Sequence, residues 1–124
     1  MPPSSYCRPA SGATPGSDHS TPGEDEARIA AVRRLVGPGV DLMVDANVSW
    51  TAEEALERGR RLEAQGIYWL EEPTVPEDVP GHARLAAALG APIAVGESLY
   101  SLHEFRRYVD ERAVEVLQID PVTR

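Results

Sequence analysis

Apolar residues fall in four short runs along the chain, and a longer stretch with helical spacing lies between one run and the next. The runs are apolar at nearly every position, which is typical of parallel strands covered on both faces. We expect strands at residues 40–45, 67–71, 92–95 and 114–119, and helices at residues 24–36, 51–65, 81–89 and 101–109. This alternation is typical of consecutive βα units around a parallel sheet.

Local signals mark where three of these helices begin. Thr51 and Glu54 form a capping box, a hydroxyl residue followed three positions later by a glutamate, and Ser101 and Glu104 form another. The earliest helix is expected to start at residues 24–26, where three acids suit the positive end of a helix. These start signals agree with the strand positions given by the apolar runs.

An acidic residue stands at or just beyond the end of each predicted strand. These residues are Asp45, Glu71, Glu97 and Asp120, and the gaps between them are 26, 26 and 23 residues. A strand, a helix and their two connections take up roughly 30 residues, so this interval places the acids at the same end of successive parallel strands. We therefore expect the four acids to converge in space.

Chain length limits the architecture that these units can build. A chain of 124 residues with 42% apolar residues can bury a core, but an eight-stranded barrel takes about 250 residues. The predicted fold class is therefore α/β, with about four consecutive βα units and parallel strands, and if these are barrel units they are part of one barrel.

Charge and composition exclude several classes of partner. A net charge of -8 disfavours nucleic acid and anionic lipid, because association would add repulsion between like charges. No apolar run is long enough for a membrane span, and the start of the chain lacks the features of a signal peptide. The single cysteine, Cys7, forms no internal disulfide and suits a reducing compartment, so we expect a cytoplasmic protein.

The first 23 residues differ in composition from the rest. They hold five prolines, five serines and three glycines, with few large apolar side chains that could offset the entropy of ordering. We expect residues 1–23 to be a disordered tail and residues 24–124 to be the barrel domain. Cys7 and His19 lie in this tail, and two isolated residues are poor evidence for a zinc site, which needs four ligands.

Three of the strand-end acids are candidate metal ligands. Asp45, Glu71 and Glu97 form an all-oxygen set without a nearby cysteine or histidine, which suits Mg²⁺, or else Mn²⁺, better than zinc or copper. Converging carboxylates repel one another, and a divalent cation would keep all three ionised. The alternative is that each acid merely begins a surface loop.

Short motifs surround these acids and carry a family resemblance. They are Val44-Asp45-Ala46-Asn47, Trp69-Leu70-Glu71-Glu72-Pro73, Gly96-Glu97-Ser98 and Gln118-Ile119-Asp120. Over residues 24–124 they resemble the successive strand-end motifs of the enolase superfamily, in the mandelate racemase-like branch that includes acid-sugar dehydratases. The glutamate at position 97 favours this branch over the muconate cycloisomerase-like branch, which usually has an aspartate there.

The resemblance implies that the fold is a partial (β/α)8 TIM barrel, and it implies roles for five residues. Asp45, Glu71 and Glu97 would bind one Mg²⁺, Asn47 would lie beside the metal and the substrate, and Asp120 would orient a catalytic histidine on the next strand. The substrate would be a small carboxylate such as a sugar acid. Its α-proton would be removed while the metal stabilises the enediolate, which then loses a β-hydroxyl in a dehydratase or is reprotonated in a racemase or epimerase. The full-length parent would be a homo-oligomer.

The sequence also departs from the family pattern. It contains no lysine, and it stops before the strand that would carry the histidine. We therefore expect a fragment from the middle of a barrel, inactive when isolated and prone to association through unpaired sheet edges. A non-catalytic remnant or association module remains the alternative to an acid-sugar dehydratase or a racemase.

The other polar side chains are weaker candidates for a functional role. His82 and His103 lie on predicted helices, where solvated positions are more common than ligand positions. The arginine pair at residues 60–61 is expected on a solvated helix face. Glu72 is equally compatible with supporting the metal ligands and with simply starting a loop.

Overall fold

The computed structural model describes residues 4–7 and 21–120. These residues form alternating strands and helices, as the apolar pattern predicts. The elements are β1 (Ser4–Cys7), α1 (Pro22–Val36), β2 (Asp41–Asp45), α2 (Ala52–Glu63), β3 (Trp69–Glu71), α3 (Val79–Ala88), β4 (Ile93–Val95), α4 (Leu102–Asp110) and β5 (Val116–Leu117).

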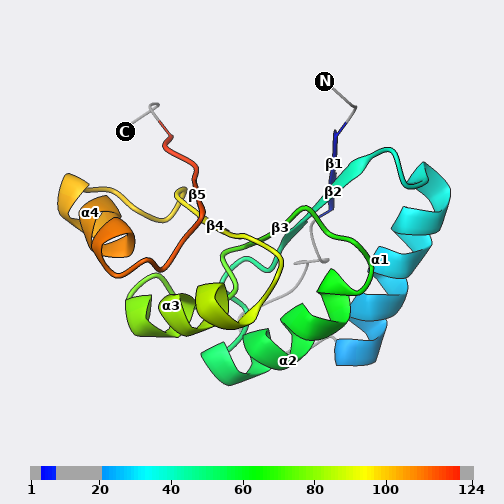
Figure 1. Ribbon diagram of the computed structural model, residues 1–124, viewed down its shortest axis with the longest axis horizontal. Helices are drawn as coiled ribbons and strands as arrows, with labels where there is room; N and C mark the ends of the chain where they lie inside the picture. Colours follow the sequence, from blue (N-terminus) through cyan, green and yellow to red (C-terminus); the bar gives the residue numbers. More distant parts are fainter. Residues whose placement is uncertain (1–3, 8–20, 121–124) are drawn as a thin grey trace, which may run out of the picture.

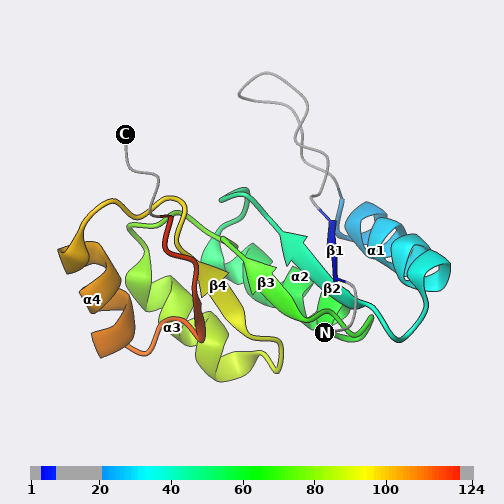
Figure 2. The ribbon, with the colours of Figure 1, turned by 90° about the horizontal axis from the view of Figure 1, so that it is seen from above.

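The five strands form one parallel sheet in the order β1-β2-β3-β4-β5, so each strand lies beside its neighbour in the sequence. The four helices follow one side of the curved sheet, while the opposite side carries no helix among the described residues (Figure 1). Figure 2 shows the same arc of strands from above. This arrangement confirms the predicted α/β class with parallel strands.

The core lies between the sheet and the helices, and it takes alternate residues of each strand. Leu42, Val44, Leu70 and Ile93 belong to the same buried cluster as Leu62 and other side chains of the helices. Successive side chains of a strand point to opposite faces. Asp45 and Glu71 therefore point to the face away from the helices, the inner face of the arc.

Helix starts were partly predicted. The capping boxes at Thr51 and Ser101 are both present. A third box, which we did not predict, joins Thr21 to Glu24 and starts α1 at Pro22. The helix begins earlier than expected because the hydroxyl of Thr21 caps it, with Pro22 in the first turn, where a missing N–H has no cost.

Two described segments of the predicted tail have regular structure: residues 22–23 belong to α1, and four residues near the start of the chain form a strand. Ser4–Cys7 form a strand whose residues pair in register with Asp41–Val44 of β2. Main-chain pairing to an open sheet edge requires little from the side chains, which explains why composition did not reveal this strand. This strand lies within the predicted tail, and residues 1–3 and 8–20 lie outside the described part of the chain, so the division into a disordered tail and a barrel domain stays a prediction.

Two further expectations need correction. The predicted strand at residues 114–119 is reduced to Val116–Leu117, because the neighbouring strand β4 has only three residues to pair with. His82 was expected to be solvated, but it is fully buried between α3 and α4. His103 is exposed, as predicted. None of the helices within the described residues is both long and apolar enough to span a membrane.

Candidate metal centre

Two of the predicted ligands lie side by side at the ends of neighbouring strands. Asp45 is the last residue of β2 and Glu71 the last of β3, and the two are register partners in the parallel ladder. Adjacent strands are about 4.8 Å apart, and register partners point to the same face. Both side chains are buried, with 0% exposure for Asp45 and 3% for Glu71. Two carboxylates are thus brought together on the inner face.

The loop after β2 keeps this pair in register. The N–H of Ala46 donates to the carbonyl of Glu71 at 2.9 Å, and the N–H of Val48 donates to the carbonyl of Glu72 at 2.8 Å. The backbone N–H of Asn47 donates to Oδ1 of Asp45 at 2.8 Å, which fixes one oxygen of that carboxylate. The side chain of Asn47 starts two residues beyond Asp45 and is partly exposed.

Two residues of the quoted motifs support Glu71 in a way that we did not predict from the sequence. Its Oε2 accepts hydrogen bonds from Nε1 of Trp69 at 3.3 Å and from Nε2 of Gln118 at 3.4 Å. Trp69 stands two positions earlier on the same strand face, and Gln118 follows β5, on the far side of β4. The strand alternation could have indicated Trp69, whereas the contact from Gln118 depends on the curvature of the sheet.

Glu72 links the second acidic motif to the third. Its Oε1 accepts a hydrogen bond from the N–H of Ser98 at 3.2 Å, and its side chain is buried. Burial raises the pKa of Glu72, and the nearby charges of Glu97 and Asp45 raise it further, whereas hydrogen bonds from Ser98 lower it. The charges of Glu97 and Asp45 thus act on Glu72. Glu72 therefore does more than start a loop.

Glu97 lies in the exposed loop between β4 and α4. The residue before it, Gly96, packs directly against the backbone of Gln118, the residue that follows β5. A Cβ atom at position 96 would lie 1.9 Å from the carbonyl oxygen of Gln118. This close approach brings the loop that carries Glu97 to the same end of the sheet as Asp45 and Glu71. Asp120 is exposed beyond β5.

The donor chemistry fits magnesium, although the ligand set is not assembled. Carboxylate oxygens are the ligands that Mg²⁺ and Mn²⁺ prefer. Within residues 4–7 and 21–120, no three His, Cys, Asp or Glu side chains already form a group arranged to hold a metal ion. The ligand roles of Asp45, Glu71 and Glu97, and the roles of Asn47 and Asp120, therefore stay predictions.

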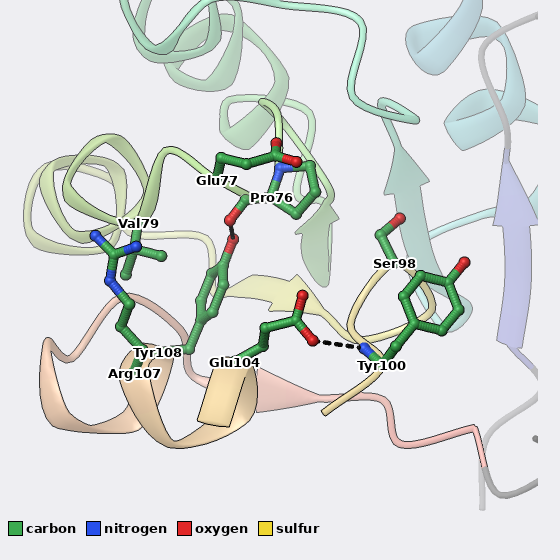
Figure 3. Close-up of a pocket in the computed structure, with 8 residues that line it drawn as sticks. All are labelled: Pro76, Glu77, Val79, Ser98, Tyr100, Glu104, Arg107 and Tyr108. Atoms are coloured by element: carbon green, nitrogen blue, oxygen red, sulfur yellow. Dashed lines mark hydrogen bonds between the residues drawn. The ribbon is translucent and has the colours of Figure 1, made fainter. Parts of the chain in front are cut away.

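A separate pocket of about 280 Å³ lies beside this centre (Figure 3). It is lined by the loop after β3, the loop after β4 and one side of α4, and Ser98 belongs to both the pocket and the contact with Glu72. Glu104 accepts a hydrogen bond from the N–H of Tyr100 at 3.0 Å on its wall. None of the five predicted site residues lines it.

Comparison with known proteins identifies the family. Residues 11–123 match the model of the family described as enolase C-terminal domain-like. The chain belongs to this family. The family resemblance seen in the sequence is therefore confirmed.

The relatives of this enolase-family chain include several acid-sugar dehydratases. It is 44% identical over 97 residues to L-talarate/galactarate dehydratase of Salmonella typhimurium, covering 78% of this chain and 24% of the relative. It is 46% identical over 97 residues to arabinonate dehydratase of Saccharolobus solfataricus, covering 78% of this chain and 26% of the relative. The chain thus spans about a quarter of the length of these relatives.

A solved structure extends the match to three dimensions. The crystal structure of L-talarate dehydratase from Polaromonas sp. JS666, complexed with Mg and L-glucarate, superposes with a TM-score of 0.79 and 38% identity. The match covers 83% of this chain and 29% of that protein. The predicted partial barrel is therefore confirmed, and this structural neighbour binds magnesium together with a sugar acid.

Proposed function

We propose that this chain is the metal-binding section of a magnesium-dependent acid-sugar dehydratase of the enolase superfamily. The observation that carries the proposal is the placement of Asp45 and Glu71, buried side by side on the inner face at the ends of β2 and β3. Two carboxylates so close in a partly dry site would repel each other when both are charged, and a divalent cation is a partner that offsets such repulsion.

Three residues would hold the ion in this proposal. Asp45 and Glu71 are already adjacent, and Glu97 lies in a loop within electrostatic range of Glu72, which neighbours Glu71. Bound magnesium supplies positive charge that stabilises the negative charge developing on the substrate carboxylate when the α-proton leaves. Asn47 would donate or accept a hydrogen bond at the substrate, and Asp120 would hold a histidine base in one orientation.

The chain lacks the lysine that the family pattern provides as a base, and this supports inactivity of the isolated chain. His82 is buried between α3 and α4, and His103 is exposed on α4. In the proposed reaction, a lysine base would have to be supplied from elsewhere. The chain by itself would therefore bind the metal without turning over the substrate.

Two alternatives rest on specific observations. A racemase or epimerase of the mandelate racemase type is supported by the crystal structure of a Streptomyces coelicolor racemase with bound magnesium, which is 37% identical to this chain. A non-catalytic remnant is supported by the lack of an assembled three-acid group among the described residues. We favour the dehydratase because both of the most similar relatives described above are acid-sugar dehydratases.

The cellular compartment and the partners of the protein are also proposals. A single cysteine in 124 residues suits the reducing cytoplasm, and the net charge of -8 disfavours nucleic acid as a partner. A homo-oligomer is proposed for a full-length parent, with a small sugar acid as its ligand.

Calorimetric titration with Mg²⁺ tests the metal site. We expect the wild-type chain to bind Mg²⁺, and Asp45→Asn and Glu71→Gln each to weaken binding by more than about tenfold, because each removes a charged ligand. Glu57→Gln is the matched control, since Glu57 is an exposed acid on α2 whose charge pairs with Arg61. Its affinity should equal that of the wild type.

Circular dichroism of each variant shows whether it is folded, so a loss of binding can be separated from a loss of structure. Equal affinity for the wild type and both site variants, or no binding by a folded wild type, would remove the magnesium proposal and leave the non-catalytic remnant. Titration with Mn²⁺, followed by its electron paramagnetic resonance signal, provides a second readout of the same ligands.

A further inference from the structure

A buried ion pair joins α1 to α2 on the outer side of the sheet. Nη1 of Arg58 lies 2.6 Å from Oδ2 of Asp25, and the two side chains are 9% and 4% exposed. A buried ion pair often contributes no more stability than apolar residues of the same volume, because both charges lose their hydration. Its clearer effect is geometric, since a charge-assisted hydrogen bond fixes the guanidinium in one place.

The fixed guanidinium supports an aromatic ring from a different element. The Cζ atom of Arg58 lies 5.2 Å from the centre of the Trp50 ring, within the range of a cation–π contact. Trp50 is 7% exposed and ends the loop that follows β2. Arg58 therefore connects α1 and α2 to this loop.

The same loop has an unfavourable backbone conformation. Asn47 and Val48 both have positive φ angles, 50° and 55°. This region is costly for a β-branched residue such as Val48, and it persists only where the surrounding contacts hold it. One end of the loop is continuous with β2 at Asp45. The other end is Trp50, whose N–H donates to the carbonyl of Pro73 at 3.3 Å.

We propose that Arg58 is a positioning residue for the metal centre. Held by Asp25, it supports Trp50 and so keeps residues 46–50 in the conformation that directs Asp45 and Asn47 to the inner face. The expected effect of Arg58 on metal binding rests on the proposed magnesium site. The expected effect of Arg58 on the loop rests only on the contacts described above.

The substitution Arg58→Lys separates the two contacts of the arginine. Lysine keeps the positive charge beside Asp25 but lacks the planar guanidinium that lies over the ring. We expect the dissociation constant for Mg²⁺ to rise about tenfold in the folded full-length chain, as when a residue that orients a metal ligand is replaced. Arg61→Lys is the matched control, because Arg61 is a 47% exposed residue of the same helix that pairs with Glu57 and Glu26. Its affinity should be unchanged.

A double-mutant cycle tests whether the effect passes through the tryptophan. Trp50→Leu should weaken Mg²⁺ binding as much as Arg58→Lys, and the double variant should be no weaker than Trp50→Leu alone. Trp50→Phe keeps an aromatic face, so its affinity should lie nearer the wild type, and it serves if the other variants fail to fold. Additive losses of affinity would contradict a shared route.

Hydrogen exchange keeps the inference separate from the proposed function. The N–H groups of Val48 and Trp50, bonded to Glu72 and Pro73, should exchange faster in Arg58→Lys than in Arg61→Lys, without any metal. If the wild type binds no Mg²⁺ but this difference appears, the metal proposal fails and the positioning of the loop stands. If the exchange rates are equal in the two variants, the positioning role is overturned.

Discussion

At the scale of single residues, the buried acids at the ends of β2 and β3 are each held by hydrogen bonds. Asp45 accepts from the N–H of Asn47, Glu71 from the side chains of Trp69 and Gln118, and Glu72 from the N–H of Ser98. Burying a charged group without such partners is very costly. These donors therefore keep the acids at the sheet end, but the donors leave the mutual repulsion of the acids in place.

His82 should make stability depend on pH. Burial lowers the pKa of His82, whose Nδ1 lies 2.9 Å from the carbonyl of Asp78 and 3.3 Å from the hydroxyl of Tyr108. Tyr108 stays neutral at and below pH values of about 8, because burial raises its pKa. As the pH falls below about 6.5, the unfolded chain takes up a proton that the folded chain resists, so the free energy of unfolding should fall by at most about 1.4 kcal/mol per pH unit.

Urea denaturation of the wild type and of His82→Asn from about pH 5 to about pH 8, on both sides of the ordinary histidine pKa, measures this dependence. The raised pKa of Glu72 acts in the opposite direction at low pH, and the difference between the two proteins removes its contribution. His103→Asn, at an exposed position, should follow the wild-type curve. Coincident curves for all three proteins would contradict the assignment to His82.

At the scale of elements, the short strands are kept together by close backbone contacts at their ends. β4 and β5 share only two register pairs, Ala94 with Val116 and Val95 with Leu117. The N–H of Gln118 extends this ladder to the carbonyl of Val95 at 2.8 Å. Gly96 allows the two backbones to approach beyond this point, so the position of Gln118 beside Glu71 depends on a residue without a side chain.

Gly96→Ala should therefore separate β4 from β5. The added Cβ would lie 1.9 Å from the oxygen and 2.4 Å from the carbon of the Gln118 carbonyl, and a backbone group cannot rotate away. We expect the free energy of unfolding to fall by about 1–3 kcal/mol, measured by denaturant titration. Gly90→Ala is the control, since its nearest atom is the flexible carboxylate of Glu63 at 3.5 Å. Equal stability of the two variants would refute the requirement for glycine at position 96.

At the scale of the whole molecule, the described chain is an open arc. β1 and β5 each pair with one neighbour, and the helices cover only the outer face (Figure 1). An unpaired strand edge offers N–H and C=O groups to another chain. Leu102 and Val109 of α4 are also 80% and 55% exposed. The fold therefore presents surfaces that favour association.

We expect the isolated chain to associate as its concentration rises, which sedimentation velocity can measure. A lysine at a sheet edge opposes strand pairing, so Val116→Lys on β5 should shift the distribution toward monomer. Val75→Lys, in the exposed loop after β3, should leave it unchanged. A wild-type monomer with a sharp cooperative melt would contradict the expectation, and association unaffected by Val116→Lys would exclude the β5 edge as the contact.

The local order of the chain was predictable because its signals lie within single elements. The apolar runs and the capping boxes of Thr51 and Ser101 gave the order of strands and helices, and the recurring acids gave the end of the sheet where Asp45 and Glu71 meet. A strand's period and a helix's cap are properties of neighbouring residues. The family resemblance also rested on short motifs at this spacing.

Contacts between distant residues were decided by the tertiary structure. Arg58 pairs with a residue 33 positions away, and Gln118 reaches Glu71 across 47 positions. The burial of His82 follows from the packing of α3 against α4, and the pairing of Ser4–Cys7 follows from an open edge of β2. Such contacts depend on how the sheet curves and the helices pack. Linear patterns determined which residues end each strand, and only packing in three dimensions determined what surrounds them.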